Sequence, residues 1–178
     1  MKLRNTIILL TMILPIMGWS DIVITEANGT FGGLGHARTH DFPVEAEIFT
    51  VRVSDPDTSG IREVNVEVSV NDLETGNAMR TSHMRMSVLD RKKHPLITFK
   101  SEIQLAEVMA GEVTLAGKLQ VNGVIKPYTL ILRLTQDSDK WRATGTVQII
   151  PTDFGLPLVG MGPMKVLDNV DLNLDVRF

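Results

Sequence analysis

The chain of 178 residues contains no cysteine. This absence excludes a disulfide framework, a lipid-modified cysteine at a signal-peptide cleavage site and a cysteine nucleophile. Aromatic residues are also scarce, at 5%, and no stretch has the pattern of a helix of globular length. Charge of neither sign dominates, because 18 basic and 21 acidic residues leave a net charge of -3. This balance does not predict electrostatic binding of nucleic acid. The fold must therefore be stabilised by packing alone.

Sequence motifs of catalysis are missing as well. There is no G-x-S-x-G elbow and no pair of carboxylates with a recognisable role. The stretch GEVTLAGKL at 111–119 has one residue too many between its glycines to be a phosphate-binding loop. The sequence thus predicts neither an enzyme nor a cofactor.

Two histidines and a carboxylate, His36, His40 and Asp41, are the strongest candidates for a metal site. On an extended strand, however, the side chains of residues 36 and 40 are separated by about 13 Å, at about 3.3 Å per residue. This distance is too long for both to bind one ion, so no metal site is predicted.

The N-terminal residues 1–20 have the organisation of a secretory signal peptide. Lys2 and Arg4 precede an apolar run at 7–17, and small residues lead up to a cleavage site after Ser20. The alternative is a membrane span, which needs about 20 apolar residues. The sequence therefore predicts a periplasmic or secreted protein.

Alternation of apolar and polar residues is the dominant signal in the rest of the chain. It is typical of antiparallel strands with one buried face. In IREVNVEVSV, at 61–70, the valines share one face, and in NVDLNLDVRF, at 169–178, the apolar residues oppose Asp, Asn and Arg. The same alternation occurs at 97–103, 112–121 and 140–149. These segments and their neighbours predict about eight strands.

Turn sequences separate the predicted strands. They are DPDTSG at 55–60, NG at 122–123 and QDSD at 136–139. In VEAEIFTVRV the alternation changes phase at Ile48 and Phe49, which indicates a bulge or a strand with both faces covered.

Without long helices, the layers must be sheet on sheet or one sheet closed on itself. The final segment stays apolar to Phe178 and needs a neighbour. Pairing it with the first strand of the mature chain, near Ile22 to Ile24, would remove both sheet edges. We therefore expect residues 21–178 to form a single all-β, antiparallel, roughly eight-stranded barrel, whose lumen is filled by side chains or holds one small ligand.

Residues 78–93 interrupt this series of strands. Met79, Met86 and Leu89 fall near three-and-four spacing with His83 between them, so a short helical segment can lie across one barrel mouth with this face down. Methionine is unbranched and adapts to irregular shapes, which suits a lid over a ligand of variable length. The alternative is a simple crossover that seals a dry core.

The order of motifs from residue 61 to the C-terminus resembles the YceI-like family of secreted, lipocalin-like β-barrels. The resemblance is carried by Thr75-Gly76-Asn77, Arg80 and His83, Pro95 ahead of ITFKS, a glycine-led hairpin, and TDFG at 152–155 before an Asp-rich alternating strand. The family is associated with polyisoprenoid or other long-chain lipids. The resemblance therefore implies a barrel whose apolar lumen takes one lipid tail, with the polar head near the open end.

The candidate binding residues fall into three groups. The lumen wall is predicted from inward apolar positions at mid-strand, namely Val66, Val68, Phe99, Leu115, Leu119, Leu132, Val147 and Leu172. The lid and mouth are predicted at Met79, Met84, Met86, Phe154 and Leu156. Arg80 and His83 are head-group candidates by resemblance.

The function implied is that of a protein that sequesters or carries a polyisoprenoid, fatty acid or fatty amide without catalysis. The basic residues at 91–94 could touch an anionic membrane surface transiently, and a homodimer is left open. The alternative function is structural or stress-related, in an envelope protein with a filled barrel and no ligand. The volume of the cavity distinguishes the two.

Overall fold

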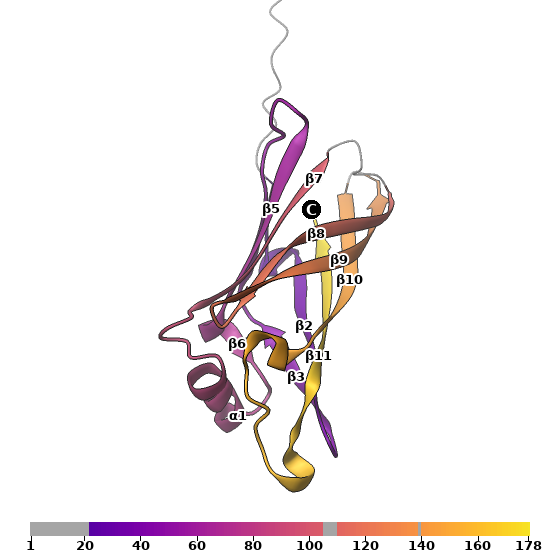
Figure 1. Ribbon diagram of the computed structural model, residues 1–178. Coiled ribbons are helices and arrows are strands. Elements are labelled where there is room, and N and C mark those ends of the chain that lie inside the picture. Colours follow the sequence, from indigo (N-terminus) through magenta and orange to yellow (C-terminus); the bar gives the residue numbers. More distant parts are fainter. Residues whose placement is uncertain (1–21, 105–109, 139) are drawn as a thin grey trace, which may run out of the picture.

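The computed structural model describes residues 22–104, 110–138 and 140–178 (Figure 1). Within these residues, the chain forms one curled antiparallel sheet of eleven strands, a half-barrel, with a single short α-helix at one end. The strands in chain order are β1 (Ile22–Thr25), β2 (Gly29–Ala37), β3 (Asp41–Ala46), β4 (Phe49–Val53), β5 (Ile61–Ser69), β6 (Leu73–Glu74), β7 (Leu96–Gln104), β8 (Gly111–Val121), β9 (Val124–Asp137), β10 (Lys140–Ile149) and β11 (Val166–Arg177). The helical segments are η1 (Glu26–Asn28), η2 (Val70–Asp72), α1 (Ala78–His83), η3 (Met84–Val88), η5 (Pro151–Phe154) and η6 (Gly162–Met164). The all-β class and the antiparallel sheet are confirmed.

We call one run of the chain along the length of the sheet a pass. Three passes contain a sharp bend, and each of them contributes two strands, one on either side of its bend. Residues 26–28, 47–48 and 70–72 connect β1 to β2, β3 to β4 and β5 to β6. The first bend is fixed locally, because the side-chain oxygen of Asn28 accepts a hydrogen bond from the backbone amide of Thr25 at 2.9 Å. Counting each bent pair once turns the eleven strands into eight passes of chain, the number predicted from the alternation.

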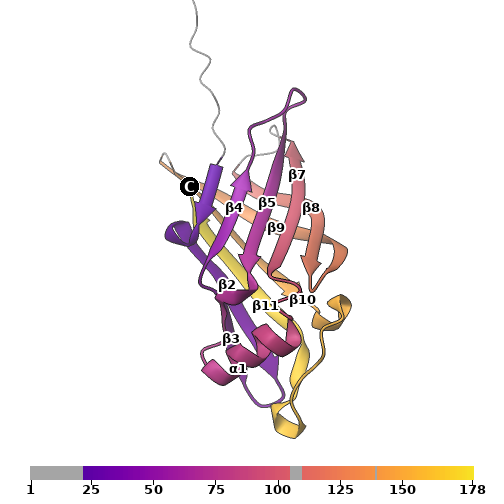
Figure 2. The same ribbon diagram turned by 90° about the vertical axis from the view of Figure 1, so that its left-hand side faces the viewer.

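The bends also explain how the two ends of the curled sheet are joined. The strand order is β1-β4-β5-β7-β8-β9-β10-β11-β2-β3-β6, so one half of each bent pass lies at each end of the sheet. Because each connection is three residues or fewer and an extended residue spans at most about 3.6 Å, the two ends of the sheet lie close together (Figure 2). Continuous chain, rather than a hydrogen-bonded seam, joins them.

The predicted pairing of the last strand with residues 22–24 is wrong. β11 pairs with β10 and β2, and Leu172 lies opposite both Val147 and Gly33, whereas β1 pairs with β4. The neighbour of β11 is therefore β2, which continues from β1 beyond the bend at residues 26–28. Glycine suits this close pairing, because a Cβ added at Gly33 would lie 1.8 Å from the carbonyl oxygen of Asp171.

Other local predictions can be compared directly with the structure. The predicted turn at 55–60 lies in the connection between β4 and β5, and Asn122 and Gly123 connect β8 to β9 with positive φ angles of 50° and 74°. The phase change at Ile48 and Phe49 marks a bend rather than a bulge, since β3 ends before Ile48 and β4 begins at Phe49. Ile48 is exposed there and Phe49 is buried.

Two predictions extend beyond the described residues. The signal peptide and its cleavage site near Ser20 lie outside them, as does residue 139 of the turn at 136–139. Among the described helices, none combines the length and the apolar character needed to cross a membrane.

The predicted helical segment forms α1 and the π-helical η3 without a break, over residues 78–88. Asn77 caps its start, because its side-chain oxygen accepts a hydrogen bond from the backbone amide of Arg80 at 3.0 Å. After the helix, Asp90 adopts a positive φ of 45°, which turns the chain toward β7.

The face that this segment turns inward agrees only in part with the prediction. Leu89 is buried in the core, as expected, but the two methionines are not. Met79 and Met86 are 82% and 53% exposed. Thr81, Met84 and Val88 instead face the barrel: Thr81 is buried, and the other two pack against the core. Positions 81, 84 and 88 also follow three-and-four spacing, so spacing alone does not select the buried face.

Candidate ligand-binding cavity

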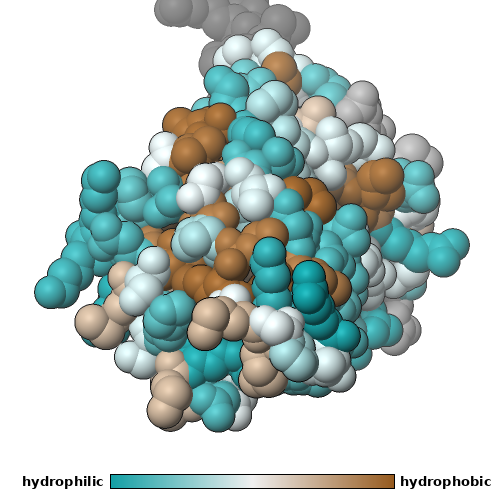
Figure 3. Space-filling view, turned by 60° about the horizontal axis from the view of Figure 1, so that its bottom comes forward, coloured by the Kyte–Doolittle hydropathy of each residue, from teal (hydrophilic) through white to brown (hydrophobic). Residues whose placement is uncertain are grey.

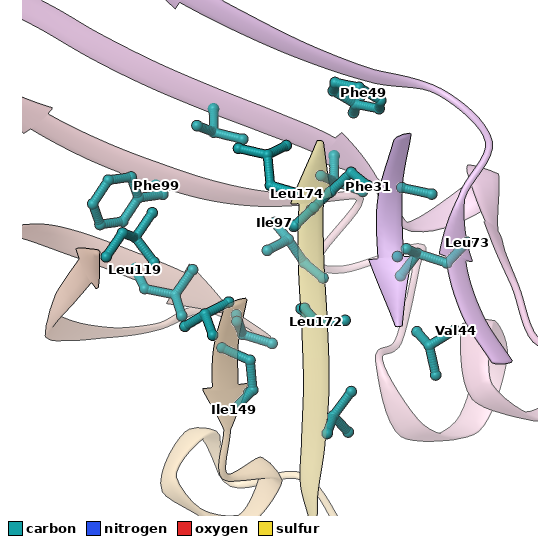
Figure 4. A pocket seen from close by; sticks show the side chains of 18 of the residues that line it. Phe31, Val44, Phe49, Leu73, Ile97, Phe99, Leu119, Ile149, Leu172 and Leu174 are labelled. Atoms are coloured by element: carbon teal, nitrogen blue, oxygen red, sulfur yellow. The ribbon is translucent and has the colours of Figure 1, made fainter. Parts of the chain in front are cut away.

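The curled sheet encloses a cavity of about 1170 Å³. Pockets for ordinary small molecules are about 300–1,000 Å³, so this cavity has room for a larger ligand. Its wall follows from the alternation of the strands, because every second side chain points inward. Figure 4 shows Phe49, Phe99, Leu119 and Leu172 facing the cavity from four different strands. The wall is almost entirely hydrocarbon.

All eight residues predicted for the lumen wall line this cavity. They come from β5 and from β7 through β11, so the fold brings together positions that are distant in the sequence. Their contact with a ligand stays a prediction.

The cavity reaches the end of the half-barrel that carries α1. Residues of α1 and η3 line it on one side, and residues 157–160 line it on another. Apolar side chains are visible in the hollow at this end in Figure 3. Of the predicted mouth residues, Met79, Met84 and Leu156 line the cavity.

Two predicted mouth residues, Met86 and Phe154, do not line the cavity. Met86 is mainly exposed on η3, and Phe154 in η5 is fully buried within the core. The sequence places both residues near the mouth, but it does not show whether a side chain there lines the cavity, is exposed to solvent or packs in the core.

Polar side chains gather at the mouth. The guanidinium of Arg80 lies 4.5 Å over the ring of Phe42 and donates a hydrogen bond to the carbonyl oxygen of Thr75. Its Nε atom is buried and has no hydrogen-bond partner among the described residues. A buried cationic N–H is costly without an acceptor, so a ligand oxygen would stabilise it. Asn77 and His83, the second head-group candidate, line the same end.

Hydrogen bonds to β6 fix α1 at the mouth. The Oγ1 atom of Thr81 donates to Glu74 and accepts from the backbone amide of Thr75, each at 3.0 Å. Arg85 donates through Nε to the carbonyl oxygen of Leu73 at 2.8 Å and pairs with Glu74. The helix is therefore part of the wall and not a loosely tethered cover.

Arg62 is a lining residue that the sequence reasoning missed. It is 5% exposed, lies near the opposite end of β5 from the mouth, and donates through Nη1 to the carbonyl oxygen of Ser54 at 2.8 Å. A signal was present, because Arg62 shares the alternation phase of Val64 and Val66. A polar residue in phase with an apolar face points inward.

The wall is discontinuous between β9 and β10. Their pairing stops at Gly145 opposite Leu132, and beyond this point β9 pairs with β8 and β10 with β11. The hydroxyl of Tyr128 bridges the split by donating to the carbonyl oxygen of Gln148. A second pocket of about 490 Å³ lies over it. The residues that line both spaces are Ile131, Thr146 and Val147.

The histidines considered for a metal have separate environments on the outer surface. His36 lies between two carboxylates, with Nδ1 2.7 Å from Asp41 and Nε2 3.0 Å from Asp171. His40 is exposed beside the hydroxyl of Thr39. Within the described ranges, no three His, Cys, Asp or Glu side chains are arranged to hold an ion. Hydrogen bonds to Asp41 and then Asp171 raise the pKa of His36 above its ordinary value.

Replacing His36 by glutamine is expected to remove a pH-dependent part of the stability. Because folding raises the pKa of His36, the imidazolium stabilises the fold fully below pH 6.5, and this contribution is lost as the pH rises through the folded-state pKa. Hydrogen bonds from Gln148 and then His36 lower the pKa of Asp171, so its contribution is present above pH 3.8 and is lost as the pH falls.

The free energy of urea unfolding of the original protein should therefore decline relative to that of H36Q as the pH rises above 6.5. His40→Gln is the control and should keep the original pH dependence, since His40 forms no ion pair with any described residue. Equal pH dependence of H36Q and the original protein would contradict the prediction.

The chain is similar in sequence to a known group of bacterial proteins. The family model for the YceI-like domain matches residues 20–178. A UPF0312 protein of Pseudomonas aeruginosa is 33% identical over 122 residues, which cover 65% of this chain and 61% of that protein. Protein YceI of Salmonella arizonae is 34% identical over 106 residues, which cover 52% of this chain and 54% of that protein. The chain thus matches little more than half of the length of these curated relatives.

Solved structures share the fold. A polyisoprenoid binding domain from Saccharophagus degradans superposes with a TM-score of 0.72 at 15% identity, covering 89% of this chain and 97% of that one. BcnA of Burkholderia cenocepacia superposes with a TM-score of 0.68 at 18% identity, covering 84% and 95%. At these identities the likeness shows the architecture.

Proposed function

Because the chain belongs to the YceI-like family, we propose that its cavity binds one long-chain lipid or isoprenoid and that the protein carries or sequesters this ligand without catalysis. The observation that supports this most is the hydrocarbon-lined cavity of about 1170 Å³, which continues to a polar mouth. The polyisoprenoid binding domain of Saccharophagus degradans, which shares this fold, supports the same ligand class. The signal-like residues 1–20 support a periplasmic location.

The energetics suit transport through water. Removing a tail from water is worth about 0.8 kcal/mol per methylene, so ten buried methylenes contribute about 8 kcal/mol before ordering costs. Without those costs, this free energy would correspond to about micromolar affinity, which additional buried methylenes can restore. Transfer from a bilayer gains almost nothing, because the tail already has apolar neighbours. The protein can thus hold a lipid in an aqueous compartment but does not extract it by tail burial alone.

The structural alternative requires a filled barrel. Side chains that interlock across the lumen would leave no cavity of ligand size, whereas the cavity in this structure is larger than an ordinary ligand pocket. The binding role is therefore favoured over the purely structural one.

Native mass spectrometry of the protein purified gently from a bacterial lysate tests the proposal. We expect a species heavier than the bare chain by the mass of one long-chain lipid, and saturable uptake of a fluorescent fatty acid after delipidation. A folded protein that shows only the bare mass and takes up no probe would overturn it.

The position of Arg80 predicts a preference for acidic head groups. Arg80→Met keeps much of the side chain's length but removes the charge and the buried Nε donor. It is expected to weaken binding of a fluorescent fatty acid about tenfold, the value of a charge-assisted hydrogen bond, and to leave binding of the corresponding fatty alcohol unchanged. The control is Arg52→Met, on an exposed position of β4. Equal losses for acid and alcohol would show that Arg80 acts only by packing over Phe42.

A further inference from the structure

The mouth of the cavity carries a surface that tail binding does not explain. We call this surface the rim and define it as residues 38–40 after β2, residues 78–88 of α1 and η3, and residues 157–165 around η6. The first and third segments are joined, because the backbone amide of Arg38 donates to the carbonyl oxygen of Lys165 at 3.1 Å. The second and third both line the cavity, and all three lie at the same end of the molecule (Figures 1 and 2).

Methionine is concentrated on the rim. Every methionine of the described residues belongs to it, namely Met79, Met84, Met86, Met161 and Met164. All except Met84 are more than half exposed, and Met161 reaches 87%. Clustered exposed apolar side chains mark interaction sites. The unbranched thioether adapts to a partner without fixed shape.

The rim is cationic although the whole chain has a net charge of -3. Its segments contain Arg38, Arg80, Arg85 and Lys165, and no Asp or Glu. Arg85 is neutralised by Glu74. Arg38 and Lys165 are exposed, and neither forms an ion pair with any residue that the structure describes. Their charge is available to an anionic partner.

We propose that the rim docks on an anionic phospholipid surface, with its exposed methionines between the head groups and with Arg38 and Lys165 at the phosphates. The docked surface continues into the lumen, because Met79 and Met164 line the cavity and are also mainly exposed. A lipid then passes between bilayer and lumen without crossing water. This last step rests on the proposed function; the docking itself does not.

A second copy of the chain fits the rim less well. A two-fold dimer places the same patch of both copies face to face. Arg38 and Lys165 of one copy would then approach the same cations of the other, and like charges opposed across an interface disfavour association. A bilayer that contains anionic lipid supplies the opposite charge.

Sedimentation with vesicles tests the apolar part of the rim. The protein is mixed with phosphatidylcholine vesicles that contain phosphatidylglycerol, and M86S/M161S is compared with it. Neither methionine lines the cavity and both are exposed. We expect the partition coefficient to fall about tenfold. This change corresponds to only part of the free energy of burying two methionine side chains, because a docked side chain is not fully buried. The control V23S/I48S, which removes two exposed apolar side chains away from the rim, should bind as the original protein does.

The charge contribution is tested with R38Q/K165Q. It is expected to weaken binding to phosphatidylglycerol-containing vesicles about tenfold, with no effect on the weak binding to pure phosphatidylcholine. Added salt should reduce the difference. The matched control R52Q/K100Q removes two exposed cations of β4 and β7.

The outcomes separate docking from ligand binding. Uptake of a soluble fluorescent fatty acid should be unchanged in both rim variants. If the protein sediments with anionic vesicles but takes up no probe, the proposed function fails and the docking stands. Absence of vesicle binding, or equal losses in the control variants, overturns the docking. Analytical ultracentrifugation gives one more outcome that would overturn the docking. If the protein forms a dimer that M86S/M161S dissociates, and if vesicles do not change the amount of dimer, the rim is a contact between copies.

Discussion

Replacement of Leu172 by tryptophan is expected to lower the affinity for a long-chain fatty-acid probe about a hundredfold. Leu172 lies on β11 in the middle of the cavity wall (Figure 4), where a bicyclic ring extends into open space. Displacing three or four methylenes of a bound tail costs about 3 kcal/mol at about 0.8 kcal/mol each, and this free energy corresponds to about a hundredfold in affinity. Fluorescence titration of the delipidated protein measures it.

The same substitution on the outer face of the same strand provides the control. Leu167→Trp changes an exposed residue of β11 that does not line the cavity, and should leave the affinity unchanged. Probes with short chains should lose less affinity in L172W than those with long chains, because fewer methylenes reach the added ring. If L172W binds the longest probe as tightly as the original protein does, the tail does not occupy this part of the lumen.

Phe154→Ala is expected to lower the free energy of unfolding by about 3–5 kcal/mol, the usual cost of deleting a buried phenylalanine. Phe154 is fully buried in η5 and packs in the core without lining the cavity. Its removal loosens the helical turn η5, which begins at Pro151 and ends at Gly155 with a positive φ of 70°. Urea unfolding followed by circular dichroism measures the change.

Ligand affinity distinguishes this structural role from the one first predicted for Phe154. The milder variant Phe154→Leu keeps a core side chain and should remain folded. Because the residue does not reach the cavity, F154L should bind the fatty-acid probe with unchanged affinity while its unfolding midpoint falls. Weaker probe binding by the folded variant, with little loss of stability, would restore the prediction that Phe154 contacts the ligand.

The wall of the cavity could be predicted because strand alternation is a local property. Val66, Leu119 and Leu172 belong to different strands, yet each lines the lumen. Once the sheet curls, all apolar faces turn to the same side, so the phase of each strand is enough to orient its side chains. The same argument would have identified Arg62, which is in phase with the valines of β5.

The mouth could not be predicted in the same way. Met79 and Met86 were expected to face inward and are mainly exposed, whereas Thr81 is buried by hydrogen bonds to β6. A short helical segment has too few residues for a periodic pattern to define its buried face. Contacts with β6, which the sequence does not reveal, decide it. The 157–165 segment reaches the mouth through similar long-range packing, and its methionines were not recognised as part of it.

The sequence alone determined that the chain is a set of antiparallel strands with hydrocarbon on one face, because that property depends on neighbours two residues apart. It also determined the number of passes and several of the turns. Only the tertiary structure decided how the sheet closes, since bends at residues 26–28, 47–48 and 70–72 carry three passes from one end of the sheet to the other. The same is true of the open lumen, because whether inward side chains meet across a barrel depends on its curvature, and no single strand contains that information.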